Sequence, residues 1–358
     1  AQIYLIGIHG GEARPLAHIE GGVSSLSWSP DSKKLLCTVR KTDAEELERR
    51  KDEQKKLLGV VARHVERVGY KMDGYGYLPK ERTHLWTVDV HTGKTKQLTD
   101  HTMYDEDSAA WSPDGKQIAF TSNRSADPDF NPDAYDLYVM PAAGGEFRKI
   151  ETPTGGKWMP VYSPDGRWIA YYGNEHPGEW FRNNCIWVVP ADGSQAARNL
   201  TKHTDLHVEA DVINDAGSPE TMPPTWSKDS QRIFFPVALH GSSLMMSIGL
   251  DGQGLQTVIG VGGVVGSFSF DREQRRLAYF YGRMHDPVQI IYRDMTNEEE
   301  RQLTHLNQDW LSKIDLGQVE EVWFKGPDGN DLQGWIIKPP DFDPSRKYPS
   351  IMEIHGGP

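Results

Sequence analysis

The stretch Trp111-Ser112-Pro113-Asp114-Gly115, followed by the apolar run Gln117–Phe120, recurs loosely along the chain. Proline presets φ for the second position of a β-turn, aspartate accepts hydrogen bonds from nearby backbone N–H groups, and glycine tolerates a left-handed conformation. The pattern therefore predicts a tight turn between an aromatic strand and an apolar strand. Further copies begin at Trp28, Tyr162, Trp226 and Phe268. Five copies indicate one structural unit that is used repeatedly.

A second apolar segment follows each turn, and turn residues rich in glycine come after it. Its copies begin at Ile3, Leu85, Leu137, Ile186, Met245 and Ile290. Several copies then close on Leu-Thr, at Leu98-Thr99, Leu200-Thr201 and Leu303-Thr304. Together the pieces predict an antiparallel sheet of about four strands in about 45 residues, which is the size of a β-propeller blade.

The fold class predicted from these repeats is all-β. We expect a β-propeller over residues 1–317, with about six visible blades. Residues 1–8 resemble the last part of a blade whose beginning is absent, so we expect seven blades in the parent protein and a natural N-terminus that lies further upstream. Residues 318–358 do not continue the repeat and are expected to begin a second domain.

An insertion of about residues 43–69 interrupts the first blade. Asp43–Leu58 is filled with good helix formers, and its acidic residues come first, which predicts one solvated helix. We expect Leu57 and Leu58 to dock one end of this helix. The insertion is interpreted either as a surface decoration or as a lid or partner-contacting arm. The aromatic loop at residues 70–77 either packs at the rim or contacts a substrate or a neighbouring domain.

Composition excludes several classes of protein. The chain has 358 residues, a net charge of −12 and 37% hydrophobic residues. An acidic chain without a basic stripe is a poor partner for nucleic acid, and no apolar run approaches the length of a membrane span. The two cysteines, Cys37 and Cys185, are expected to be buried free thiols. We expect a cytoplasmic protein, although a signal peptide upstream of Ala1 stays open.

One group of polar residues has the composition of a metal site. It consists of His203, His207, Glu209 and Asp211. Structural zinc sites usually show tighter Cys/His signatures, and catalytic ones a pair of histidines on a helix. This stretch lacks helix signals and follows Leu-Thr, where the chain is expected to cross between blades. We therefore predict no metal and no cofactor.

The last forty residues predict a different arrangement of strands. Residues 319–324 and 332–338 read as two strands joined by a Gly-Pro-Asp-Gly turn, and residues 348–354 read as a new buried strand. The chain then ends on His355-Gly356-Gly357-Pro358.

Residues 334–358, which end in Tyr-Pro-Ser-Ile-Met-Glu-Ile-His-Gly-Gly-Pro, resemble the start of the α/β-hydrolase domain of prolyl oligopeptidase-family serine peptidases. The acylaminoacyl-peptidase-like branch is the most similar. The repeated turns and the loop at residues 73–76 resemble that branch too, so the likeness covers essentially the whole chain. It implies a hydrolase that cleaves short peptides by a Ser-Asp-His mechanism and releases N-acylated amino acids, with the propeller limiting access.

The same resemblance implies roles for two glycines at the end of the chain. The backbone N–H of Gly357, with Gly356 beside it, would contribute to the oxyanion hole, where fixed donors need no reorganisation as charge develops. His355 would shape this loop and would not be the general base. The implied partners are a short peptide substrate and the remainder of the hydrolase domain, and a homo-oligomer is left open.

The sequence departs from the family pattern in one respect. The Gly-x-Ser-x-Gly nucleophile elbow is absent, because Ser24, Ser243 and Ser267 lie near a glycine but lack the second one at the right offset. The catalytic triad is therefore expected outside this chain. Two alternatives stay open: a non-catalytic propeller that binds a peptide or protein, and a hydrolase of another ester or amide on the same architecture. An unpaired apolar strand at residues 350–354 argues against the binding propeller.

Overall fold

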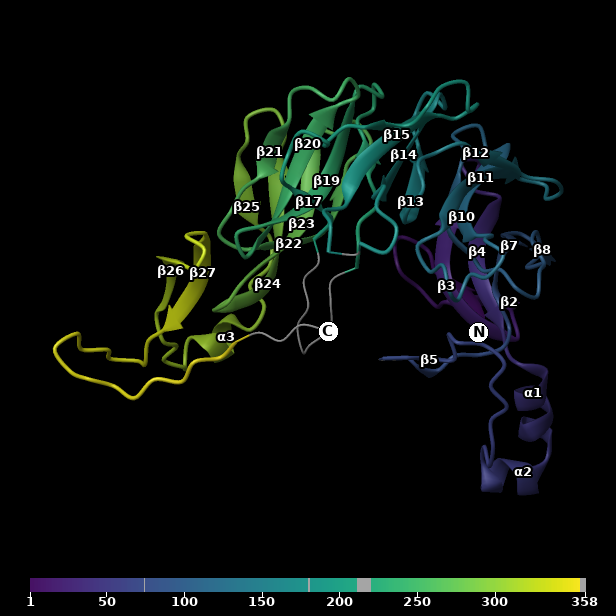
Figure 1. Cartoon of the computed structure of the whole chain (residues 1–358), viewed down its shortest axis with the longest axis horizontal. Coiled ribbons are helices and arrows are strands. Elements are labelled where there is room, and N and C mark those ends of the chain that lie inside the picture. The colour runs from purple at the N-terminus through teal and green to yellow at the C-terminus, as the bar shows by residue number, and fades with distance from the viewer. Residues whose placement is uncertain (74, 180, 211–219, 355–358) are drawn as a thin grey trace. The chain divides into compact units, whose positions relative to one another are not determined.

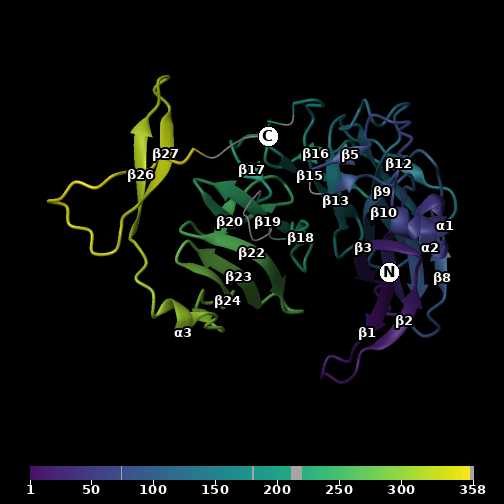
Figure 2. The same ribbon diagram turned by 90° about the horizontal axis from the view of Figure 1, so that it is seen from below.

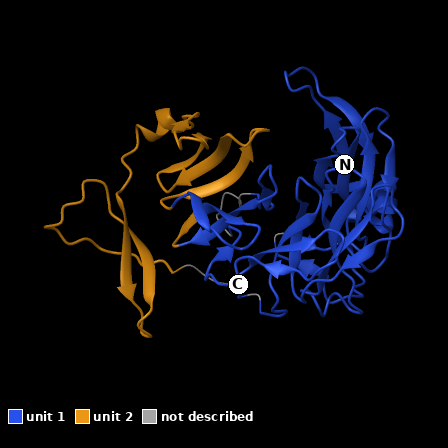
Figure 3. Cartoon of the chain, turned by 90° about the horizontal axis from the view of Figure 1, so that it is seen from above, with its two compact units in different colours: residues 1–239, 244–260 blue, residues 240–243, 261–358 orange. Residues whose placement is uncertain are grey.

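The structure is a computed structural model that describes residues 1–73, 75–179, 181–210 and 220–354. Most of its secondary structure consists of antiparallel strands (Figure 1). The chain divides into two compact units, which are residues 1–239 with 244–260 and residues 240–243 with 261–358 (Figure 3). The predicted division at residue 317 remains a prediction. None of the described helices is both long enough and apolar enough to cross a membrane.

Three consecutive four-stranded sheets in the first unit share one antiparallel meander order. The first sheet contains β3 (Gly21–Trp28), β4 (Lys34–Lys41), β7 (Thr83–Asp89) and β8 (Thr95–Gln97). The second contains β9 (Glu106–Trp111), β10 (Gln117–Asn123), β11 (Tyr135–Pro141) and β12 (Arg148–Ile150). The third contains β13 (Lys157–Tyr162), β14 (Trp168–Gly173), β15 (Cys185–Pro190) and β16 (Arg198–Asn199).

Two further repeats follow the same strand order. In the fourth, β17 (His207–Val208) and β18 (Thr225–Trp226) both pair with β19 (Arg232–Leu239), and β20 (Ser242–Gly249) pairs with β21 (Gln256–Ile259). The fifth contains β22 (Val264–Phe270), β23 (Arg276–Arg283), β24 (Asp286–Asp294) and β25 (Glu300–Gln302). A separate pair, β1 (Gln2–Leu5) with β2 (Arg14–His18), precedes the first repeat. All six apolar segments predicted to follow the turns are therefore confirmed as strands.

The repeated turn joins the first strand of each repeat to the second, and the structure shows why serine and aspartate occur there. Ser112 Oγ donates to Asp114 Oδ1 at 2.7 Å and accepts from the backbone N–H of Gln117 at 2.9 Å. Gly115 has φ = 68°. Turns at Ser29, Ser163 and Ser227 repeat both side-chain contacts. The hydroxyl thus holds the turn closed from both sides.

The fifth turn lies two residues later than the sequence alignment predicts. The repeated sequence pattern places Phe268 at the position that Trp111 holds in the second repeat. In the structure, β22 continues to Phe270 and the turn begins at Asp271. The carboxylate of Asp271 accepts from the N–H groups of Arg275 and Arg276 at 2.7 and 3.1 Å, as the serine hydroxyl does elsewhere. The prediction was wrong in register because a carboxylate replaces the hydroxyl as the acceptor in this copy.

The Leu-Thr pairs close each sheet against its third strand. Thr99 Oγ1 accepts from the N–H of Leu85 at 3.0 Å, and the N–H of Leu98 donates to the carbonyl of Leu85 at 2.7 Å. The pairs at residues 200–201 and 303–304 make the same two contacts. A threonine is needed there because its hydroxyl satisfies a buried N–H that no fourth-strand carbonyl reaches.

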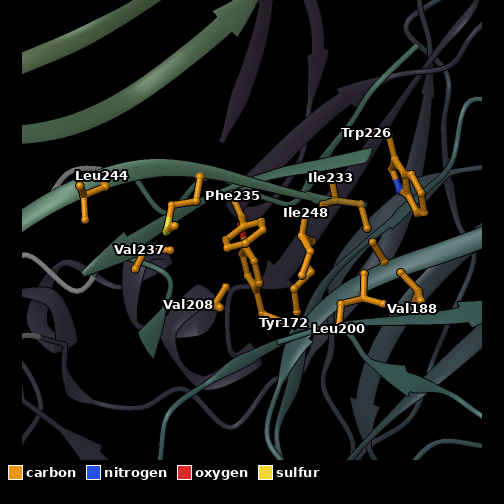
Figure 4. Packing of buried hydrophobic residues seen from close by; sticks show 13 residues of the cluster. Tyr172, Val188, Leu200, Val208, Trp226, Ile233, Phe235, Val237, Leu244 and Ile248 are labelled. Atoms are coloured by element: carbon orange, nitrogen blue, oxygen red, sulfur yellow. The ribbon is translucent and has the colours of Figure 1, made fainter. Parts of the chain in front are cut away.

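Successive sheets pack face to face through apolar side chains. The largest cluster joins the third and fourth repeats and includes Tyr172, Val188, Phe235 and Ile248, each no more than 1% exposed (Figure 4). Fully burying one such side chain contributes about 1.5–3 kcal/mol. The exit strands are apolar on both faces because each lies between two neighbouring sheets.

The insertion differs from the predicted single helix. It forms two short helices, α1 (Ala44–Lys51) and α2 (Glu53–Leu58), which project from the first sheet in Figure 1. Asp52 separates them, since its carboxylate accepts from the N–H groups of Gln54 and Lys55 and so caps α2. Leu57 and Leu58 are 89% and 70% exposed, so the predicted docking of this end was wrong within the described structure. Residues 59–69 are not helical.

The segment after the repeats contains the first two predicted strands but not the third. A short helix, α3 (Gln308–Leu311), precedes the hairpin of β26 (Val319–Lys325) and β27 (Asp331–Ile337), whose two arrows lie side by side in Figure 2. Residues 348–354 form no strand, and Ile351 and Met352 are 98% and 84% exposed. The predicted buried strand is therefore not found, because no described strand pairs with this segment.

Candidate functional site

The two edges of each repeat differ in their connections. We call the edge that carries the Ser-Pro-Asp-Gly turns the turn edge, and the opposite one, where the second strand ends and the third begins, the connection edge. Three long connections leave the connection edges of the first three repeats, at residues 42–82, 124–134 and 174–184. The fourth and fifth repeats have connections of two residues. The elaborated connection edges are therefore the natural place for a binding site on the first unit.

A buried ionic network lies on the connection edges of the first two repeats. Glu106, the first residue of β9, is fully buried. Its carboxylate lies 2.8 Å from Nδ1 of His84, the second residue of β7, and it pairs through its other oxygen with Arg124, which follows β10. The Arg124 guanidinium also lies over the rings of Tyr104 and Phe147. Both oxygens thus have a polar partner, as a buried carboxylate requires.

Asp105 holds a second set of partners beside the first. It pairs with Arg40 at 3.3 Å and with Arg82 at 3.0 Å, and its Oδ1 accepts from the N–H of Thr83 at 2.7 Å. Arg40 is the next-to-last residue of β4, whereas Arg82 is the last residue of the long insertion. The pair of arginines therefore ties the insertion to the start of β9 in the second repeat.

Asp107 is the third acid in this run and the least compensated one. Its carboxylate accepts no hydrogen bond within the described part of the chain. Burial raises its pKa to about 6, and the neighbouring charge of Asp105 adds to that effect while Arg40 opposes it. Burial likewise raises the pKa of the nearby Tyr135 to about 12. Burial without a hydrogen-bond partner thus favours the protonated form of this carboxyl.

Lys157 completes the charged set at the start of β13. Its Nζ donates to the carbonyls of Tyr135 and Gly155, each at 2.9 Å, and the residue is 3% exposed. Burial lowers its pKa to about 8. The ammonium thereby joins the connection edges of the second and third repeats, which is a structural role.

The insertion adds a groove of about 840 Å³ to the same edge of the first repeat. The two ends of the insertion are held together by Asp43, whose carboxylate accepts from the N–H groups of Lys80 and Glu81. Further along, Arg67 and Asp129 form a two-pronged ion pair, and Asp129 also accepts from the N–H of Gly69. The insertion is thus fixed to the connection of the second repeat.

The residues selected from the sequence fall mostly outside this network. Gly356 and Gly357, with His355, lie outside the described residues, so their oxyanion-hole role remains a prediction. Two of the serines near glycines have structural contacts, since Ser24 donates to the carbonyl of Thr38 and the buried Ser243 donates to that of Val265.

The histidine and acid group of residues 203–211 is only partly described. Asp211 lies outside the described residues. Glu209 is buried and accepts from Nε1 of Trp158 at 3.0 Å. No cluster of three potential metal ligands occurs in the described part of the chain. The carboxylate of Glu209 thus already serves the packing of the third repeat.

The sequence gives little warning of the ionic network. Its members come from five separate stretches of chain and follow no spacing rule. The one available signal is the run Asp105-Glu106-Asp107, which places three acidic residues at the start of a strand that is expected to be buried. Such a run is unusual, because acids are rarely buried unless they are paired.

Comparison with known proteins relates the chain to peptidases. The uncharacterized peptidase YuxL of Bacillus subtilis is 30% identical over 361 residues, covering 100% of this chain and 54% of YuxL. Dipeptidyl-peptidase 5 of Porphyromonas gingivalis is 24% identical over 352 residues, and the matched region covers 94% of this chain and 48% of that protein. No model of a protein family matches the chain.

The fold points the same way. The solved acylaminoacyl peptidase of Pyrococcus horikoshii superposes with a TM-score of 0.70 at 21% identity, covering 94% of this chain and 47% of that one. These relatives support a prolyl oligopeptidase-family peptidase. The family resemblance seen in the sequence is thereby confirmed. The chain spans about half the length of the curated relatives it matches, so the activity of the whole protein is a proposal.

The charged network and the groove lie at the same edge of the first two repeats. The carboxylates of Asp105 and Glu106 are paired with basic side chains there, and the groove presents apolar surface beside them. Bond cleavage would need a nucleophile that the sequence-selected serines do not supply.

Proposed function

We propose that the chain is the propeller portion, together with the beginning of the α/β-hydrolase domain, of a serine peptidase that hydrolyses short peptides. The observation that carries this proposal is the similarity of the whole chain to a peptidase of Bacillus subtilis. The propeller of residues 1–317, with about six visible blades, would gate access to a Ser-Asp-His triad that lies outside this chain. Three four-stranded sheets, a nine-stranded sheet that contains two further repeats, and the β1–β2 pair support that count.

In this proposal Gly356 and Gly357 supply backbone N–H groups to the oxyanion hole. The reaction would run by serine attack on the peptide carbonyl, formation of an acyl-enzyme with release of the amine, and attack by water. Donors held by the backbone lower the barrier because they are aimed at the developing oxyanion before the reaction begins.

For the substrate we propose an N-acylated peptide whose first acyl amino acid is released. Support comes from the likeness in fold to acylaminoacyl peptidases. A second candidate is release of dipeptides from a free N-terminus, which the relatives named dipeptidyl-peptidase 5 favour. The third is a non-catalytic propeller that binds a peptide or a protein. A cytoplasmic location completes the proposal and can be checked by cell fractionation.

The deciding experiment uses the full-length protein and a fluorophosphonate probe that labels activated serines. Labelling of one serine, followed by cleavage of acetyl-alanyl-p-nitroanilide in preference to alanyl-alanyl-p-nitroanilide, would support the acylaminoacyl assignment. The reverse preference would support the dipeptidyl assignment. Absence of both labelling and cleavage would leave the binding propeller as the better account.

A further inference from the structure

The groove in the insertion of the first repeat has a lining that the gating role does not require. Its apolar part includes Leu58, Val60, Val65, Tyr70 and Tyr77, which are between 43% and 70% exposed. Contiguous exposed apolar side chains on this scale mark ligand or partner sites more often than ordinary solvated surface. The groove volume of about 840 Å³ lies in the range of small-molecule and short-peptide pockets.

The carboxylates of the lining are all engaged within the insertion itself. The contacts are Glu46 with Arg49 and Arg50, Glu45 with Lys80 at 2.9 Å, Glu66 with the His64 ring at 3.6 Å, and Asp43 with two backbone N–H groups. Asp43, Glu45 and Glu46 are therefore engaged by N–H groups or basic side chains, and Glu66 faces a histidine ring.

Two lining cations remain after the other basic residues are assigned. Arg67 is held by Asp129 and Arg82 by Asp105. In the described residues, neither Arg63 nor Lys55 has a carboxylate within 4.0 Å. The guanidinium carbon of Arg63 lies 4.1 Å from the centre of the Tyr77 ring. A guanidinium that stacks by its face keeps its N–H edge available for a planar anion.

We propose that this groove binds the C-terminal carboxylate and the adjoining apolar side chains of a short peptide. Arg63 and Lys55 would take the carboxylate, and the valines and tyrosines would take the side chains. A carboxylate next to apolar groups matches both halves of the lining, whereas a polyanion would be repelled by a chain of net charge −12. The identification of this peptide as a substrate rests on the proposed peptidase function; the binding itself does not.

The test measures peptide binding calorimetrically on the full-length protein after fluorophosphonate treatment, so that no peptide is consumed. The probes are acetyl-Val-Leu-Leu with a free C-terminal acid, the same peptide as its amide, and an amide that carries an internal glutamate. We expect the acid to bind about tenfold more tightly than either amide. Arg63→Gln and Lys55→Gln should each remove most of that preference, whereas Arg63→Lys should keep part of it.

Lys56→Gln is the matched control, because Lys56 is a neighbouring basic residue that pairs with Glu53 and does not line the groove. Thermal unfolding shows whether each variant is folded. Equal binding of acid and amide would overturn the proposal, as would a loss on Lys56→Gln as large as on Arg63→Gln. Tight binding of the glutamate amide would overturn the assignment to the C-terminus. If the protein bound the acid but was not labelled by the fluorophosphonate probe, the proposal for the groove would stand and the proposed peptidase function would be overturned.

Discussion

The turn edge and the connection edge of the same repeats are stabilised in different ways, the first by contacts within one turn and the second by contacts between distant segments of the chain. At the turn edge, a short exposed motif recurs five times and makes its hydrogen bonds within six residues of chain. At the connection edge, buried charges such as Glu106 find partners 18 and 22 residues away in other strands. The comparison teaches that the turn edge specifies the fold of each repeat. The connection edge carries the features by which the repeats of this chain differ from one another.

The largest expected effect tests the connection edge. Glu106→Ala would leave Arg124 buried without its carboxylate, which should reduce the free energy of unfolding by about 3–5 kcal/mol. The measurement is chemical denaturation of the purified chain. Glu106→Gln is the control, since an amide keeps an acceptor for Arg124 and should cost less. Equal stability of wild type and Glu106→Ala would show that the network is not buried.

A pH dependence should distinguish Asp107 from acids at the turn edge. Because its folded pKa of about 6 lies above the ordinary value of about 3.9, the folded state holds the proton more tightly, and stability should fall as pH rises from about 4 to about 6. The cost is about 1–3 kcal/mol and persists above pH 6. Asp107→Asn should therefore be more stable than wild type at pH 7 and equal to it below pH 4.

Denaturation curves of the two proteins at pH 4, 5, 6 and 7 measure this difference. Asp114→Asn is the matched control at the turn edge. The pKa of Asp114 is lowered, chiefly by the hydroxyl of Ser112, so its replacement should not stabilise the protein at pH 7. If the free energy of unfolding changed equally in the wild type and in Asp107→Asn between pH 4 and 6, the assignment to Asp107 would be contradicted.

The Leu-Thr closure should have an intermediate effect. Thr99→Val preserves shape but leaves the N–H of Leu85 without its acceptor in a buried position, at a cost of about 1–3 kcal/mol. Hydrogen exchange at the Leu85 amide should accelerate along with the loss of stability. Thr95→Val, at the start of the preceding strand β8, is the control. Unchanged exchange at Leu85 would show that water replaces the hydroxyl there.

The smallest expected effect is at the turn edge. Gly115→Ala should cost no more than about 1 kcal/mol, although φ is 68°, because the added Cβ would meet nothing closer than Pro30 Cδ at 3.6 Å. Ser32, Ser230 and Gln274 already occupy this left-handed position in other repeats. Gly93→Ala is the contrasting variant, since its Cβ would lie 2.1 Å from the carbonyl of Leu16. Equal losses from the two variants would refute the steric argument.

Much of the repeat could be predicted because its determinants are local. Proline, serine and glycine act within a single turn, and alternation of aromatic and apolar residues marks the strands on either side. The register of the fifth turn was missed because Asp271 performs the task of a serine. The insertion was read as one helix because composition does not reveal that Asp52 caps a second one.

The candidate site was much less predictable. The glycines at residues 356–357 were found through family resemblance, and the structure does not describe them. The partners of Glu106 and Asp105 could not be found, because His84, Arg124 and Arg40 become neighbours only when three strands align at one edge. Arg63 and Lys55 attract attention only after every other charge in the groove has been assigned.

By itself the sequence determined the repeating sheet, the helical nature of the insertion and the likeness to a peptidase family, since short-range backbone preferences and apolar periodicity depend on neighbouring residues. Only the tertiary structure decided which charges are buried together, which turn changed its register and where a groove remains open. The physical reason is that electrostatic partners are selected by distance in space, and strands far apart in the chain set those distances when they pair.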